Sequence, residues 1–175
     1  MIKERPILFS SAMVRAILDG HKKQTRRVIN PGKYLSCLDP EDDQEQLLKY
    51  CPYGQTGDRL WVRETWSDGP NPWGKPVVYR ADVTPEMYAT YEDCDIPRYW
   101  KSPIYMPRWA SRITLEIVGV RVERLQSISQ DDAIAEGVFM LAYKSHVDSF
   151  AATWDEINAK RGHSWESNPL VWAIE

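Results

Sequence analysis

The segment from Arg112 to Leu125 is RITLEIVGVRVERL, and it carries the clearest strand signal in the chain. Apolar side chains occupy the odd positions 113, 115 and 117 and then the even positions 118, 120 and 122. Because successive side chains point to opposite faces of a strand, this change of phase predicts one inserted residue, a β-bulge, beside Gly119. A strand of this length with one kink favours a small closed barrel.

Weaker signals on both sides of this segment predict the remaining elements. Ser10 or Ser11 caps a helix whose apolar face includes Met13, Val14, Ile17 and Leu18 and which Gly20 ends. Further helices are expected at 46–48, 129–136 and 147–157, and strands at 6–9, 59–66, 77–80 and 170–174. The strands do not alternate regularly with helices, so a doubly wound parallel sheet is disfavoured. The pattern predicts an α+β fold, a mostly antiparallel barrel with helices packed outside.

Length and charge limit the classes of protein to consider. A chain of 175 residues suits a single domain, 1–175. The segment 65–107 is rich in Pro, Gly, Trp and Tyr, and we expect an insertion or lid there. The net charge of −3 argues against a protein that coats long duplexes, although a local basic patch can still bind a nucleotide. Without a long apolar run or a signal peptide, a cytoplasmic protein with no membrane span is expected.

The three cysteines, Cys37, Cys51 and Cys94, do not form a disulfide framework by count or spacing. Reduced thiols in a cytosolic protein are their expected state. A zinc site built from Cys37, Cys51 and a histidine is disfavoured, because no Cys-x-x-Cys or His-x-x-x-His spacing is present. We therefore expect neither a metal nor a cofactor.

A dense basic run follows the first predicted helix. Residues 20–27 are GHKKQTRR, with Lys22 and Thr25 three positions apart. A free lysine has a pKa of about 10.4 and is a poor nucleophile at neutral pH. Burial and the nearby cations Lys23, Arg26 and Arg27 would lower that pKa. The run is interpreted either as a solvated basic loop or as a nucleotide-facing surface whose amine takes part in chemistry.

Two other places carry candidate residues. Glu136 ends the helix predicted at 129–136, where the helix dipole disfavours a carboxylate. It is either an exposed helix-end residue or a general acid or base. Arg63 and Glu64 follow Trp61 in a predicted strand. They are expected either to bridge each other or to contact a substrate, and Trp61 either to fill the core or to stack on a base.

Residues 15–27, RAILDGHKKQTRR, resemble the opening Gly-Arg-Lys-Thr-x-Thr-x-Arg motif of the ASCH family, with His21 and Lys23 where the family has Arg and Thr. Three other stretches resemble the phage and prophage branch of that family: 57–66, GDRLWVRETW; 106–115, MPRWASRITL; and 168–172, NPLVW. The resemblance spans nearly the whole chain.

The resemblance implies a PUA-like β-barrel with flanking helices and a nucleoside or RNA ligand. Some small bacterial ASCH proteins are amidohydrolases that remove acyl groups from N4 of cytidine. Their catalytic lysine, threonine and glutamate correspond to Lys22, Thr25 and Glu136, with Lys23 as the alternative amine. The candidate substrate-binding residues are Arg26, Arg27, Arg63, Glu64 and Trp61.

The expected function is therefore hydrolysis of an N4-acylated cytidine or a related modified nucleoside, in the cytoplasm of a bacterium that carries the phage or prophage. The expected partner is a modified cytidine nucleoside or a short RNA. The alternative is an ASCH-type module that binds RNA or a modified nucleotide, or a ribonuclease. The alternative predicts salt-dependent affinity for oligonucleotides, because phosphate contacts release counterions.

Overall fold

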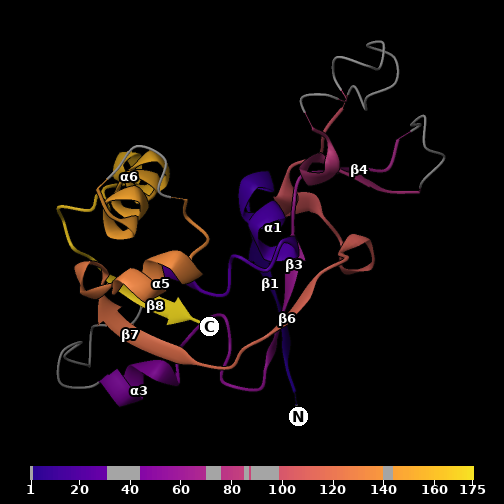
Figure 1. Ribbon diagram of the computed structural model, residues 1–175. Helices are drawn as coiled ribbons and strands as arrows, with labels where there is room; N and C mark the ends of the chain where they lie inside the picture. Colours follow the sequence, from indigo (N-terminus) through magenta and orange to yellow (C-terminus); the bar gives the residue numbers. More distant parts are fainter. Residues whose placement is uncertain (1, 31–43, 70–75, 85–86, 88–98, 140–143) are drawn as a thin grey trace.

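The computed structural model describes residues 2–30, 44–69, 76–84, 87, 99–139 and 144–175. Its strands form three small sheets, with helices beside them (Figure 1). The fold is therefore α+β, as the sequence predicts. Within these ranges the strands do not close into a barrel, so a PUA-like barrel stays a prediction. The insertion expected at 65–107 lies partly outside the described residues.

The first sheet contains β1 (Glu4–Leu8), β3 (Arg59–Arg63) and β6 (Thr114–Glu116), in the order β1-β3-β6. β1 runs parallel to β3, whereas β6 runs antiparallel to it. Leu60 and Val62 of β3 are buried in the main core, as their alternation predicts. The first helix packs against this sheet through the main hydrophobic core (Figure 1).

The second sheet contains β2 (Thr25–Val28), β8 (Leu170–Ile174) and β7 (Val120–Arg124), in the order β2-β8-β7. Both pairs are antiparallel. β8 has the bounds expected from sequence. Adjacent side chains of β8 pack in different hydrophobic cores. Val171 packs in the core that includes Phe150 and Trp154, whereas Trp172 packs in the core between the first helix and the first sheet.

The segment 112–125 connects these two sheets. The expectation of one continuous kinked strand is wrong, because β6 pairs with β3 and β7 pairs with β8. The change occurs at the predicted irregularity: the amides of Val118 and Gly119 both donate to the carbonyl of Glu175, at 2.7 and 3.3 Å. Val118 and Gly119 thus lie opposite the single residue Glu175, which is the pattern of a β-bulge. The extra residue changes which face of the chain is buried and turns the chain from the first sheet toward the second.

Four helices are described: α1 (Ser11–Leu18), α3 (Gln44–Leu48), α5 (Gln130–Ala135) and α6 (His146–Asn158). Serine hydroxyls cap three of them: Ser10 accepts from an amide of α1, Ser129 from one of α5 and Ser145 from one of α6. α1 buries Val14 and Ala16. The expectation that Leu18 belongs to its buried face is wrong, because this side chain is 53% exposed.

The remaining described elements are short. β4 (Trp66–Ser67) and β5 (Val78–Tyr79) form a two-stranded sheet. Single turns of 3₁₀ helix occur at Arg80–Asp82, Pro103–Tyr105, Arg108–Ala110, Leu125–Ser127 and Ala159–Arg161. None of the helices in the described ranges has the length and apolar character of a membrane span.

Candidate functional site

Lys22 lies in a connection that is held between the ends of two helices. The amides of residues 21 and 22 donate to the carbonyl of Ala16 in α1, at 2.8 and 2.9 Å. The amides of residues 23 and 24 donate to the carbonyl of Ala135 in α5, at 2.7 and 2.9 Å. Each helix ends before a left-handed glycine, Gly20 (φ 74°) or Gly137 (φ 77°). The basic run is therefore fixed by backbone hydrogen bonds and is not a free loop.

This arrangement brings Lys22 against Glu136, which caps the C-terminal end of α5. The Lys22 Nζ atom donates to Oε2 of Glu136 at 2.7 Å and to its backbone carbonyl at 2.9 Å. The two side chains are only 3% and 6% exposed. Neighbouring Lys23 is exposed, so the buried amine of the pair of lysines is Lys22.

Burial holds the pKa of the Lys22 amine below its ordinary value, although the Glu136 carboxylate acts in the opposite direction. Arg27 and Arg26 add to the lowering by like-charge repulsion. The neutral amine of Lys22 is therefore easier to form than that of an exposed lysine, and the carboxylate beside it can accept the proton.

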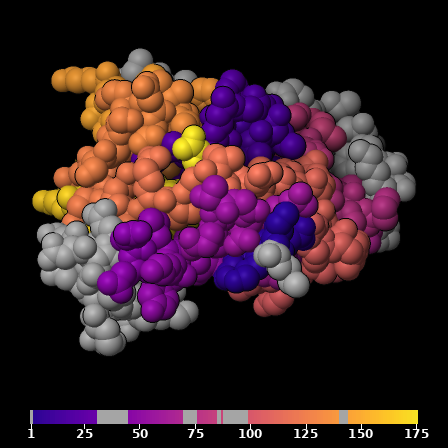
Figure 2. Space-filling model, turned by 90° about the horizontal axis from the view of Figure 1, so that it is seen from below, coloured from indigo at the N-terminus to yellow at the C-terminus, as the bar shows by residue number. Residues whose placement is uncertain are grey.

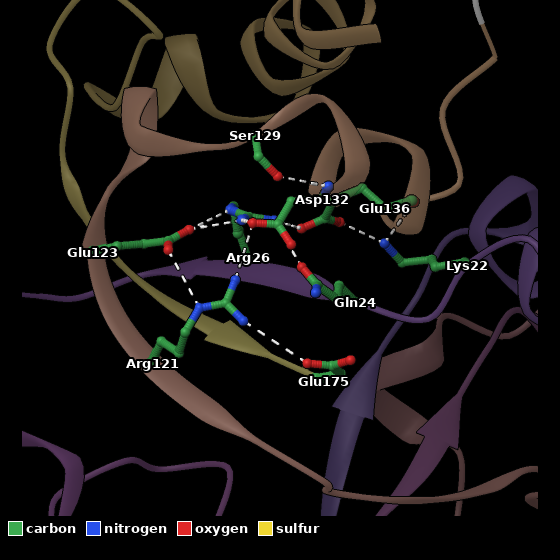
Figure 3. A network of polar contacts seen from close by, with 9 residues as sticks. All are labelled: Lys22, Gln24, Arg26, Arg121, Glu123, Ser129, Asp132, Glu136 and Glu175. Atoms are coloured by element: carbon green, nitrogen blue, oxygen red, sulfur yellow. Dashed lines mark hydrogen bonds and ion pairs between the residues drawn. The ribbon is translucent and has the colours of Figure 1, made fainter.

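The Arg26 guanidinium forms ion pairs with three carboxylates, those of Glu136, Asp132 and Glu123 (Figure 3). Its Nη1 donates to Oε1 of Glu136 at 3.2 Å, and its Nη2 lies 3.0 Å from Oδ2 of Asp132 and 2.7 Å from Oε1 of Glu123. The Arg26 side chain is fully buried. Arg26 therefore fixes the orientation of the Glu136 carboxylate, and the contact with a substrate expected for it stays a prediction.

An outer ring of polar contacts supports Arg26. Arg121 pairs with Asp132 at 3.0 Å and lies 3.5 Å from Glu123. Gln24 accepts from Arg26 through its Oε1 atom at 3.3 Å (Figure 3). Burial opposes the ionisation of Asp132, but the Gln24 amide and the two guanidinium groups outweigh it and hold the pKa of Asp132 below its ordinary value. The Asp132 carboxylate is thus kept charged beside the buried guanidinium.

Lys22 and Glu136 line a large cavity of about 830 Å³. Thr25, Arg26 and Arg27 line the same cavity, so three catalytic candidates and two binding candidates meet there. Arg27 donates to the carbonyl of Leu8 at 2.7 Å and lies over the ring of Phe9. The aromatic side chains that contribute to the wall are Tyr53, Phe139, Phe150 and Trp154. A cavity of this volume with a few polar groups among apolar walls is typical of a site for a small organic ligand.

The other three binding candidates lie elsewhere. Glu64 is 1% exposed and pairs with Arg112 at 2.9 Å, not with Arg63 as expected. Burial raises the pKa of Glu64, and Arg112 opposes that change. Arg63 lies 4.7 Å over the ring of Trp61, which is itself buried. None of Trp61, Arg63 and Glu64 is among the described residues that line the large cavity.

Sequence reasoning missed the residues that support Glu136. Glu123 and Arg121 are two positions apart on β7 and therefore share one face, a signal that was available in the sequence. Asp132 was recognisable only as part of a helix start. Its pairing with Arg26 depends on the packing of α5 against β2, which no local pattern indicates.

No family model matches the chain, and no curated protein or solved structure matches it either. Among the described residues, no group of three or more His, Cys, Asp and Glu side chains is placed to hold a metal ion. The site must therefore be interpreted from its own chemistry: a shielded amine, a carboxylate at hydrogen-bond distance, a hydroxyl and a guanidinium around one cavity.

Proposed function

We propose that this protein is an amidohydrolase that removes an acyl group from the exocyclic N4 of an acylated cytidine or a related modified nucleoside. The observation that carries the proposal is the shielded contact of 2.7 Å between Lys22 and Glu136 on the wall of an 830 Å³ cavity. The substrate class comes from the resemblance to the ASCH family, and with it we propose a PUA-like single domain.

The pair supplies a route for two protons. Lys22 passes a proton to the Glu136 carboxylate, and its neutral amine then accepts the proton of an oxygen nucleophile. The candidate nucleophile is the hydroxyl of Thr25, which lines the same cavity. Its oxygen attacks the acyl carbon, the bond from carbon to N4 breaks, and Glu136 returns its proton to the leaving nitrogen. Water then hydrolyses the ester on Thr25.

Lys22 is better suited to this role as a base than to direct attack. An acyl group on the Lys22 amine would form another amide, which is no easier to hydrolyse than the substrate. An ester on a hydroxyl is more reactive, so the proton-accepting role completes a catalytic cycle. Arg26 holds the Glu136 carboxylate, and Arg27 is a further cation on the cavity wall that could contact the substrate.

The proposal is tested by incubating the protein with N4-acetylcytidine and measuring release of cytidine and acetate. Lys22→Ala should lower kcat/KM by about a thousandfold, within the range of general acid–base catalysis. Lys160→Ala is the control and should retain activity, because this lysine is exposed and is not among the described residues that line the cavity. Wild-type activity in Lys22→Ala would reject the mechanism.

Activity should also depend on pH in a defined direction. A Lys22 amine that is already neutral accepts the proton of the hydroxyl without first passing its own proton to Glu136, so kcat/KM should rise with pH. Because burial lowers the pKa of Lys22, the midpoint of this rise should lie below the ordinary value of 10.5. A midpoint at or above 10.5 would contradict the assignment of Lys22 as the base.

The positions of the basic residues count against the alternative of a module or nuclease that binds RNA through this run. Lys22 and Arg26 are buried and paired with carboxylates. Of the four cations in the run, Lys23 is the one that is exposed and Arg27 is half-buried. Strong binding of a polyanion requires several cations that face the phosphates.

A further inference from the structure

A second, smaller cavity lies next to the proposed catalytic residues. Its volume is about 130 Å³, and Lys22 and Thr25 line it as well as the large cavity. Its apolar walls are Phe9, Ile17, Leu60, Leu115, Ile117 and Ile174. These side chains come from α1, from both main sheets and from the chain beside them. Lys22 and Thr25, the two lining residues that the cavities share, therefore stand between a large cavity and a small one.

The small cavity also has an open side. The exposed Lys23, Glu116 and Glu175 contribute to its lining. Figure 2 shows the yellow C-terminal end of the chain at the surface, between indigo N-terminal residues and orange residues of the later strands. A ligand group in this cavity would therefore have its inner end at Lys22 and Thr25 and its outer end near solvent.

The two cavities differ in the groups that face them. Glu136 and Arg27 line the large cavity and are not among the described residues that line the small one. In amide hydrolysis the proton must reach the leaving nitrogen, which stays with the nucleoside. The nucleoside therefore belongs on the side of Glu136, and the acyl chain belongs on the opposite side of the attacked carbon.

We propose that the small cavity is the acyl subsite of this enzyme, and that it selects short apolar acyl groups; this inference rests on the proposed function. Its volume is close to that of an engineered apolar cavity of about 150 Å³ that binds benzene. It would accommodate propionyl, butyryl or benzoyl groups and would leave part of its volume unfilled by acetyl. Burial of each added methylene contributes to binding until the cavity is full.

The experiment measures kcat/KM for cytidine carrying acetyl, propionyl, butyryl, benzoyl or octanoyl groups on N4. For the wild-type protein, kcat/KM should rise from acetyl to butyryl and then level off, because the end of an octanoyl chain would lie in solvent at the open side. One methylene that fits or fails to fit an apolar pocket changes kcat/KM by about 10-fold to 200-fold. Equal values for acetyl and butyryl would overturn the subsite, without any variant being needed.

Two substitutions change the cavity without altering a residue of the large one. Leu115→Phe should narrow it and lower the ratio of butyryl to acetyl kcat/KM by about tenfold. Ile17→Ala should widen it and raise the ratio of octanoyl to acetyl. Both residues are half-buried, and neither is among the described residues of the large cavity. Leu18→Phe is the matched control, because Leu18 is 53% exposed and is among the described lining residues of neither cavity.

The outcomes separate this inference from the proposed function. Hydrolysis with ratios that follow the cavity volume supports the acyl subsite. Hydrolysis with the same ratios in wild type, Leu115→Phe and Ile17→Ala, each verified as folded by thermal unfolding, rejects the subsite and leaves the proposed function standing. An absence of hydrolysis for every compound in the series rejects both.

Discussion

Replacing Glu136 by glutamine tests whether Lys22 is held as a buried ammonium. The substitution keeps the size of the side chain and leaves one amide oxygen, which can accept from Lys22 or from Arg26. It removes the negative charge that lies 2.7 Å from Nζ of a lysine whose side chain is 3% exposed. Arg26 still forms ion pairs with Asp132 and Glu123 in the variant, so the charge left without a partner is that of Lys22.

In the variant Lys22 either stays charged without a partner or loses its proton, and the cheaper of these two states sets the upper limit of the loss of stability. Leaving one partner of a buried ion pair uncompensated costs about 3–5 kcal/mol. The amine can instead lose its proton, which from an ordinary pKa of 10.5 costs about 4 kcal/mol at pH 7.5, at about 1.4 kcal/mol per pH unit. We therefore expect the free energy of unfolding of Glu136→Gln to be about 3–4 kcal/mol below wild type at pH 7.5.

The second alternative gives a pH dependence with a definite sign. In the variant the folded state holds a neutral Lys22, whereas the unfolded state still binds the proton below pH 10.5. Stability therefore rises with pH in the variant, by up to about 1.4 kcal/mol per pH unit. In wild type the Glu136 carboxylate opposes the effect of burial on the pKa of Lys22, so stability should rise less steeply with pH there, and the difference between the two proteins should shrink by up to about 2 kcal/mol from pH 7.5 to pH 9.

The assay is urea unfolding of wild type and Glu136→Gln at pH 7.5 and pH 9, with equal m-values as the check on two-state behaviour. Glu156→Gln is the matched control, because Glu156 lines the same cavity but is exposed, and its effect should stay within about 0.5 kcal/mol. A difference between wild type and Glu136→Gln that is the same at both pH values would contradict the loss of the Lys22 proton in the variant.

Gly137→Ala should destabilise the fold by about 2–4 kcal/mol, because Gly137 has a φ of 77° and an added Cβ would lie 2.9 Å from the Cβ of Lys22. Gly162→Ala has a similar φ of 83° with no atom within 4 Å of the added Cβ, so thermal unfolding should show a loss of only about 1–2 kcal/mol; equal losses at both glycines would contradict the close approach. Arg26→Gln should cost about 3–5 kcal/mol in urea unfolding, because it leaves several carboxylates without their buried cation. Arg121→Gln, whose side chain is 44% exposed, should cost about 1 kcal/mol or less, and a larger loss than for Arg26→Gln would reverse the proposed order of the network.

The parts of the fold that the sequence predicts well are those with a local physical signal. α5 begins at the serine whose hydroxyl can cap it, and its terminal Glu136 precedes a left-handed glycine. β8 is a short apolar run after Pro169, and it has the predicted bounds. The irregularity near Gly119 is visible because side-chain alternation depends only on neighbouring residues.

The same reasoning fails where partners are distant in the chain. Local pattern does not show that the segment 112–125 divides between two sheets, because each half needs a different partner strand. It also expects Glu64 to pair with its neighbour Arg63, whereas the packing of the first sheet places Arg112 there. Adjacent residues on a strand point to opposite faces, so a distant cation can approach where a neighbour cannot.

For the candidate site, the sequence by itself determined the types of side chain, the spacing of Lys22 and Thr25, and the helix end that carries Glu136. Only the tertiary structure decided that Lys22 and Glu136, which are 114 positions apart, meet at 2.7 Å and that Lys23 does not. The reason is that the ends of α1 and α5 both hold the backbone of residues 21–24, which turns one lysine into the core and leaves the other in solvent. Burial then lowers the pKa of that one amine, an effect that depends on neighbours in space and not in sequence.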